Sequence, residues 1–181
     1  MTILHPGSNT AVFTPDEIRK LIMTIPKNIN RERFEALLFT GCRYTELLEV
    51  HNKLDRLQEN TLKVKNTKAF ADTRFRFVQL NNPGRRAVEY YLRSKEPLPG
   101  YISWWENMKR WCTLAGINPE GVGVKSTRKT WESWLVTTYP HEIERIFLSQ
   151  GHSRTIALKH YLTFPFSKQD KEDMLFYVDG W

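Results

Sequence analysis

Residues 37 to 47 read Leu-Leu-Phe-Thr-Gly-Cys-Arg-Tyr-Thr-Glu-Leu, an apolar run that stops at a glycine and is followed at once by an arginine. The leucines fall at helical spacing and Gly41 breaks the pattern, which predicts a core-facing helix and then a turn. Arg43 is presented directly after this turn. A guanidinium held there suits a bidentate contact with phosphate, whereas the commoner reading of such an arginine is a surface residue after a helix end.

Two further helices are predicted around this stretch. Thr14-Pro15-Asp16-Glu17 is a capping box with proline at the first helical position, so a helix is expected over about 15–25. Asn30 is predicted to cap the helix that ends at Gly41. A short helix is expected through Glu46 to Val50.

Strand character is confined to one region. Residues 62–65 and 74–80 alternate apolar and polar side chains. A preceding strand near 54–57, turned back at Glu59-Asn60, would complete a small antiparallel sheet, with 66–73 joining the other two strands. The basic residues on these strands are expected to face outward.

Helical patterns return after residue 83. A capping box at Ser103 to Glu106 predicts a helix to about Leu114. The sequence therefore indicates one mainly α domain with a three-stranded antiparallel sheet, an α+β fold. The remaining predicted helices run over about 126–138, 141–149, 153–162 and 168–178.

Length and composition indicate one globular domain. The chain has 181 residues, 40% of them hydrophobic, which suffices for a sizeable core. The formal net charge is +7, and residues 60–130 hold 14 basic against 5 acidic side chains. A concentrated basic excess is the expected footprint of nucleic-acid binding, although a solvated basic face has the same composition.

Other classes of protein are disfavoured. Cys42 and Cys112 stand far apart without a CxxC or a histidine at ligand spacing, which argues against a zinc site or a disulfide scaffold. No apolar run reaches membrane-spanning length and no secretory signal pattern opens the chain. A reducing cytoplasm is the expected location.

Three more segments carry residues suited to phosphate chemistry. Lys68 lies near the expected hairpin tip and would donate a proton to a leaving oxygen, or simply protect a sheet edge. Lys125 and Arg128 share a helix face near its N-terminus, where they would converge on one anion. His152 follows Gly151, and Tyr161 comes nine residues later; singly, such residues are more often packing residues.

Taken in order, these segments resemble the catalytic domain of the tyrosine recombinases, or integrases, of the phage or archaeal-virus type. That family's pattern is Arg, Lys, His-or-Lys-x-x-Arg, His-or-Trp and Tyr, and here TGCRYTEL, the hairpin lysine, KSTR, QGH and KHYL follow in turn. The resemblance implies Tyr161 as nucleophile, Arg43 and Arg128 as phosphate clamp, Lys68 as hairpin lysine, and Lys125 and His152 as supporting acid–base and hydrogen-bond groups. The sequence departs from the family pattern at Lys125, which stands where histidine is commoner. The hairpin position stays open between Lys68 and Lys65.

The resemblance also implies the reaction and the partners. It predicts DNA strand exchange through a 3′-phosphotyrosyl intermediate, carried out on double-stranded DNA by a tetramer. The exchange would serve integration of a virus or mobile element or, by the same chemistry, inversion or resolution. No cofactor, metal, membrane or small-molecule substrate is expected, and few carboxylates lie in the matched segments. A catalytically silent DNA-binding module is the alternative.

The expected organisation is an N-terminal extension over 1–13, a catalytic domain over 14–163 and a tail over 164–181. The family normally carries a further N-terminal DNA-binding domain, so the chain reads either as a catalytic fragment or as a minimal member. The tail would pack on a neighbouring protomer or on its own chain.

Overall fold

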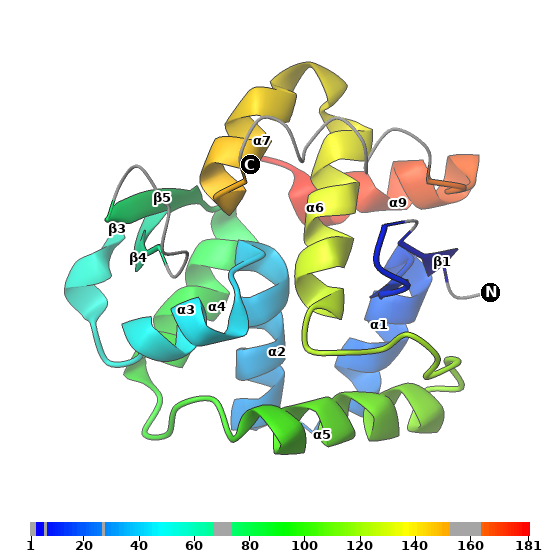
Figure 1. Cartoon of the computed structure of the whole chain (residues 1–181), viewed down its shortest axis with the longest axis horizontal. Helices are drawn as coiled ribbons and strands as arrows, with labels where there is room; N and C mark the ends of the chain where they lie inside the picture. The colour runs from blue at the N-terminus through cyan, green and yellow to red at the C-terminus, as the bar shows by residue number, and fades with distance from the viewer. Residues whose placement is uncertain (1–2, 6, 27, 67–73, 153–163) are drawn as a thin grey trace.

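The computed structural model describes residues 3–5, 7–26, 28–66, 74–152 and 164–181. Two helices, α2 (Ile29–Thr40) and α6 (Ser126–Thr138), stand side by side at its centre (Figure 1). Phe39 of α2 meets Trp131 of α6 edge to face, with ring centroids 5.6 Å apart. This pair forms the middle of the core, and the other helices are arranged around it.

The helices α1 and α2 each begin after a residue whose side chain caps the helix. In α1 (Pro15–Thr24), the Thr14 side chain accepts the Glu17 amide and the Glu17 side chain accepts the Thr14 amide, which confirms the capping box. The predicted cap of α2 is wrong, because Asn28 has the extended backbone of an N-cap and its side chain accepts the amide of Asn30. Asn30 itself lies in the first turn.

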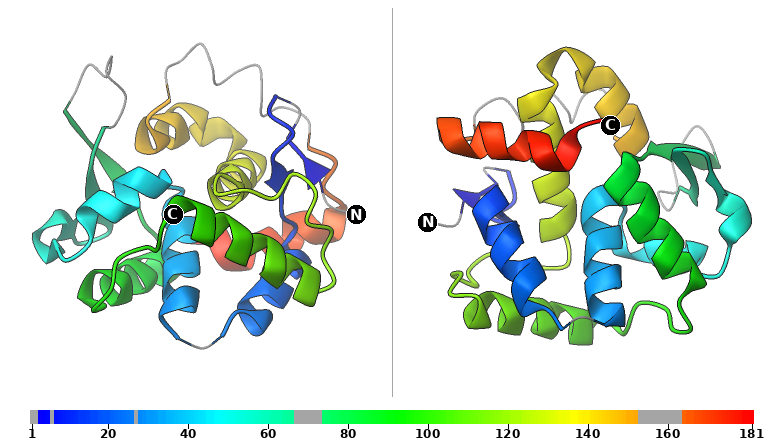
Figure 2. Two further views of the ribbon diagram at one scale, coloured as in Figure 1. Left: turned by 60° about the horizontal axis from the view of Figure 1, so that its bottom comes forward. Right: turned by 180° about the vertical axis from the view of Figure 1, so that it is seen from behind.

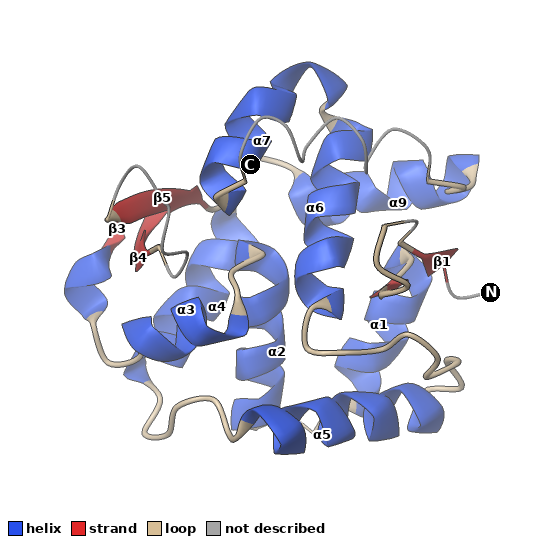
Figure 3. Ribbon diagram, in the orientation of Figure 1, coloured by secondary structure: helices blue, strands red, loops and turns tan. Residues whose placement is uncertain are grey.

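The predicted sheet is confirmed. It has the order β3 (Leu57–Gln58), β4 (Thr61–Lys65), β5 (Phe75–Gln79), with antiparallel neighbours, and lies at one end of the molecule (Figure 3). The turn between β3 and β4 contains Glu59 at φ 47°. The expected first strand is shorter than predicted, because its start is a 3-10 turn, η1 (Leu54–Arg56).

The helix predicted from Ser103 is also placed slightly wrongly. It starts at Tyr101 after Gly100, so the Ser103 to Glu106 box lies inside the first turns and caps nothing. The remaining elements are β1 (Ile3–Leu4), β2 (Ala11–Val12), α3 (Tyr44–Val50), α4 (Asn82–Arg93), α5 (Tyr101–Leu114), η2 (Pro140–Glu142), α7 (Ile143–Gln150) and α9 (Lys168–Val178). The helix predicted over 153–162 lies outside the described residues.

The C-terminal helix α9 packs against α6 and α1 of its own chain, as the view from behind shows (Figure 2). Tyr177 lies over Phe39 and Trp134, and Trp181 stacks on Tyr139. Packing of this tail on a second copy stays a prediction. Both cysteines are buried and unpaired, and no helix in the described part of the chain is long and apolar enough to cross a membrane.

Candidate active site

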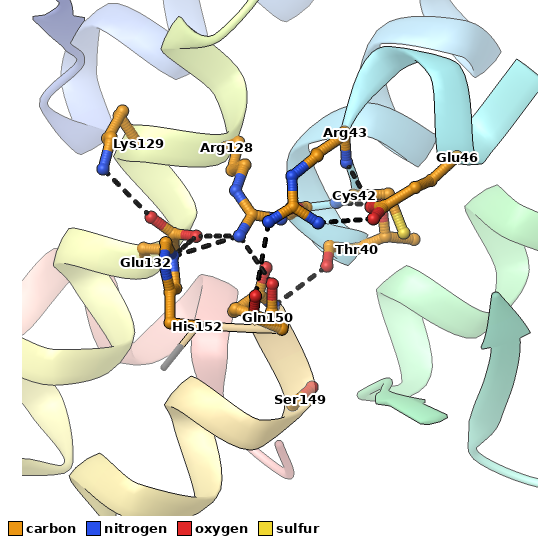
Figure 4. A network of polar contacts seen from close by, with 12 residues as sticks. Thr40, Cys42, Arg43, Glu46, Arg128, Lys129, Glu132, Ser149, Gln150 and His152 are labelled. Carbon is orange, nitrogen blue, oxygen red and sulfur yellow. Dashed lines mark hydrogen bonds and ion pairs between the residues drawn. The ribbon is translucent and has the colours of Figure 1, made fainter. Parts of the chain in front are cut away.

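The candidate site lies where the C-terminal end of α2, the N-terminal part of α6 and the C-terminal end of α7 meet (Figure 4). Gly41 and Gly151 end α2 and α7 in the left-handed conformation, with φ of 58° and 68°. A Cβ on Gly41 would lie 2.5 Å from Gln150 Oε1 and 2.9 Å from Trp131 Cδ1. Glycine is therefore required at position 41 both for its backbone angle and for the close approach of α7 and α6.

Arg128 joins these three elements. Its Nη1 donates to the Gly41 carbonyl at 2.7 Å, and its Nη2 donates to the Gln150 carbonyl at 2.6 Å. Nη2 also lies 2.8 Å from Oε1 of Glu132, one turn along the same helix. With 8% of its side chain exposed, this guanidinium is held in one orientation.

Arg43 approaches the turn at the C-terminal end of α7 from α3. It is the N-cap residue of this helix, and its amide donates to Glu46 Oε2 at 2.8 Å. Its Nη1 donates to Glu46 Oε1 at 2.5 Å and its Nη2 to the Gly151 carbonyl at 3.3 Å. Because Arg128 and Arg43 bind consecutive carbonyls of one turn, the two guanidiniums meet there, with Arg43 the more exposed at 22%.

A third arginine supports this pair, and the sequence interpretation missed it. Arg76 on β5 was expected to face outward, which is wrong: it lies on the buried face of the sheet and forms two 2.8 Å bonds to Glu46. Its Nε donates to the Ser149 carbonyl at 2.9 Å. A buried arginine becomes tolerable because a carboxylate, itself fully buried, neutralises it. The available signal was Glu46, three residues after Arg43 on the predicted short helix.

A second buried carboxylate, Glu132, was also missed. Its Oε1 lies 2.7 Å from His152 Nε2, and its Oε2 lies 3.5 Å from Lys129 Nζ. Burial works against ionisation of Glu132, but the charge of Arg128 and the hydrogen bond from His152 outweigh it and hold the pKa well below the usual range. Few carboxylates were expected in the matched segments. Glu132 lies outside them, four residues after Arg128, so that expectation did not describe the whole site.

The surroundings of His152 favour its neutral form. Burial lowers its pKa, and the positive charges of Arg128 and Lys129 lower it further, against the opposing effect of Glu132. Its ring also meets the edge of Phe147 on α7, with centroids 5.9 Å apart. The ring is thus available as a hydrogen-bonding group rather than as a fixed positive charge.

Positive charge exceeds negative charge among these described side chains. Arg43, Arg76, Arg128 and Lys129 surround the two glutamates, which leaves two positive charges uncompensated while His152 is neutral. Burial opposes ionisation of Glu46 as well, but its hydrogen bonds and charge interaction with Arg76, assisted by Arg43, keep its pKa below the usual value. The site can therefore attract and hold an anion.

The structure brings three of the six predicted site residues together: Arg43, Arg128 and His152. Lys125 is the N-cap residue of α6 and is exposed, whereas Arg128 is buried one turn further on. Lys68 and Tyr161 lie outside the described residues. The competing Lys65 ends β4, exposed and opposite Phe75.

Solved structures show where this fold belongs. The chain is similar to XerA recombinase (18% identity, TM-score 0.68, covering 91% of this chain and 64% of that one). It is also similar to XerH site-specific recombinase bound to its difH substrate in a pre-cleavage complex (19%, 0.65, 84% and 50%). A third is the Tn1549 transposon integrase in complex with circular intermediate DNA (16%, 0.68, 89% and 65%).

The mainly helical domain with its small antiparallel sheet therefore has the tyrosine recombinase catalytic-domain fold. The chain spans between half and about two thirds of the length of these recombinases and integrases. No protein-family model matches the sequence, and no curated protein does.

Proposed function

We propose that this protein is a site-specific DNA recombinase that cuts and rejoins strands through a covalent 3′-phosphotyrosyl intermediate. The observation that carries the proposal is the meeting of Arg43 and Arg128 at one turn beside a neutral His152. The net positive charge there suits the negative charge of a five-coordinate phosphodiester transition state, which preorganised cations stabilise.

In this reaction the Tyr161 hydroxyl gives its proton to a supporting acid–base group of the site, its oxygen forms a bond to phosphorus, and the bond from phosphorus to the 5′ oxygen breaks. Arg43 and Arg128 bind the two non-bridging oxygens, and His152 is a supporting acid–base group beside Arg128. Lys68 gives its proton to the departing 5′ oxygen, with Lys65 as the competing lysine and Lys125 as a supporting group. Attack of a 5′ hydroxyl on the phosphotyrosine reverses the step, so the phosphodiester energy is conserved.

Double-stranded DNA is the proposed substrate, and the basic residues of 60–130 supply its non-specific attraction. XerH and the Tn1549 integrase were solved with DNA, in keeping with a DNA-binding role for this fold. We further propose that the protein acts as a tetramer on DNA and serves integration of a virus or a mobile element. In this scheme residues 14–163 form the catalytic domain.

The decisive experiment uses a DNA substrate with a nick near the cleavage site, so that the released fragment diffuses away and the covalent adduct accumulates. Denaturing electrophoresis should show an adduct for the wild-type protein, in EDTA as well as in Mg²⁺. Tyr161→Phe should abolish the adduct while DNA affinity stays within about twofold, because one hydroxyl among many contacts is lost.

Tyr139→Phe and Tyr177→Phe are the matched controls, because each removes one hydroxyl from a tyrosine engaged in packing. Tyr139 donates to the Val178 carbonyl at 3.1 Å, and Tyr177 lies against Trp134. Both variants should keep the adduct. DNA binding without any adduct from the wild-type protein would favour the silent DNA-binding module, and an adduct that requires Mg²⁺ would contradict the proposed chemistry.

A further inference from the structure

Glu132 occupies a position in the site that the proposed reaction does not use. Its side chain is fully buried, and one oxygen, Oε1, lies 2.8 Å from Arg128 Nη2 and 2.7 Å from His152 Nε2. The other oxygen faces Lys129 at 3.5 Å. A carboxylate in an anion-binding site weakens its net attraction for phosphate, so its presence needs a reason of another kind.

The geometry decides which nitrogen of His152 carries the proton. An ionised carboxylate only accepts hydrogen bonds, so the 2.7 Å contact requires a hydrogen on Nε2. Arg128 Nη2 also lies 3.0 Å from Nε2, but a guanidinium only donates and cannot bond to a protonated nitrogen. The short distance between Nη2 and Nε2 therefore follows from both groups converging on Oε1.

We propose that Glu132 is a positioning residue, which fixes His152 as the Nε2-protonated tautomer and orients the Arg128 guanidinium beside it. This assignment rests on the proposed recombinase function for its catalytic meaning, but the tautomer itself does not depend on that function.

The charged groups that face His152 define what loss of the carboxylate would do. Arg128, Lys129 and Glu132 all belong to α6, while Arg43 reaches the adjacent Gly151 carbonyl from α3. Glu132 is thus the negative charge among these groups of the described chain that favours a proton on His152. Replacing it with a neutral amide leaves the cations and should make the imidazolium harder to form.

The first test observes the wild-type protein. Long-range ¹H–¹⁵N spectra of the imidazole rings, with His152 assigned by its absence in His152→Ala, report the protonated nitrogen directly. We expect a neutral ring protonated at Nε2 at pH 7. A ring protonated at Nδ1 in the wild-type protein would overturn the proposal, whether or not the protein cleaves DNA.

The second test compares Glu132→Gln with Glu132→Asp and with Glu142→Gln, which changes a half-exposed glutamate of η2 in the same way. Glu132→Gln should lower the midpoint of His152 titration by about 1 to 3 pH units and slow adduct formation about 10- to 100-fold. Glu132→Asp should restore part of the rate because it keeps the charge, and Glu142→Gln should change neither property.

A double variant separates positioning from a general structural role. If Glu132 acts largely through His152, then Glu132→Gln should slow adduct formation by a clearly smaller factor in the His152→Ala background than in the wild-type protein. An equal loss in both backgrounds, with the His152 titration unmoved, would contradict the proposal. If the wild-type protein shows the expected tautomer but forms no adduct, the recombinase function is refuted and the tautomer assignment still holds.

Discussion

Replacing Arg76 with methionine is expected to destabilise the protein strongly, although this arginine lies on a strand that reads as half exposed. Arg76 makes two bonds to Glu46 and one to the Ser149 carbonyl, and only 6% of its side chain is exposed. Methionine preserves most of the aliphatic volume, so the substitution isolates the loss of the guanidinium. Glu46, which is fully buried, would keep Arg43 as its ion-pair partner within the described part of the chain.

The magnitude follows from the burial of the pair. Removing one member of a buried ion pair leaves an uncompensated charge and costs about 3 to 5 kcal/mol. In a protein of this size, about 1 kcal/mol moves the melting temperature by about 2 to 4 °C, so a fall of about 6 to 20 °C is expected. The lower part of this range is expected, because Arg43 already binds Glu46 at 2.5 Å and still compensates part of its charge.

Lys63→Met is the matched control, because Lys63 lies on the other face of the same sheet. Its ammonium is 4.9 Å from the centroid of the Phe75 ring, a contact worth at most about 1 kcal/mol at such a site. Both variants remove one positive charge, so non-specific effects of net charge cancel. Thermal and urea unfolding of the two variants, measured side by side, give the difference.

A second arm tests the cause of the loss. In the Arg76→Met/Glu46→Gln double variant, position 46 no longer carries the charge that Arg76 compensated. The sum of the losses of stability in the two single variants should therefore exceed the loss in the double variant by about 1 to 3 kcal/mol. Losses that simply add would show that Glu46 is not the partner that matters. An Arg76→Met protein no less stable than Lys63→Met would refute the reasoning altogether.

Three further predictions concern the turn, the acid response and the leaving group. Gly41→Ala should destabilise by about 1 to 2 kcal/mol more than Gly116→Ala in urea unfolding, because both have positive φ but a Cβ meets neighbours only at Gly41. Glu46 has a lowered pKa, so its stabilisation is complete above about pH 4.5 and is lost as the pH falls through its folded pKa; Glu46→Gln should therefore flatten the stability curve below pH 4.5. Cleavage by Lys68→Ala should recover on DNA with sulfur at the 5′ bridging position, which hardly needs an acid. Recovery by Lys65→Ala instead would reassign the hairpin lysine.

The fold could be predicted from the sequence because its signals are local. The Thr14 capping box and the alternation in 62–65 and 74–80 act through neighbouring residues, and the structure confirms the helix and the sheet that they predicted. The predicted start of α2 was wrong because two nearby residues could each act as its N-cap. Asn28 and Asn30 are both good N-caps, and only the backbone entering α2 decides between them.

The predicted part of the site has a different limit. Arg43, Arg128 and His152 could be found from order and spacing, and the structure brings them together. Arg76 and Glu132 could not, because an arginine in an alternating strand and a glutamate in a helix read as solvent-facing. Their burial depends on partners 30 and 20 residues away in sequence.

The buried glutamates explain how several arginines can pack close together in the site. Three guanidiniums packed around the ends of α2 and α7 would repel one another, and burial already lowers the pKa of Arg128. Glu46 and Glu132 each bind arginine and remove that repulsion before any substrate arrives. Because two carboxylates do not neutralise four cations, positive charge remains, so the same glutamates that stabilise the packed arginines leave the site attractive to an anion.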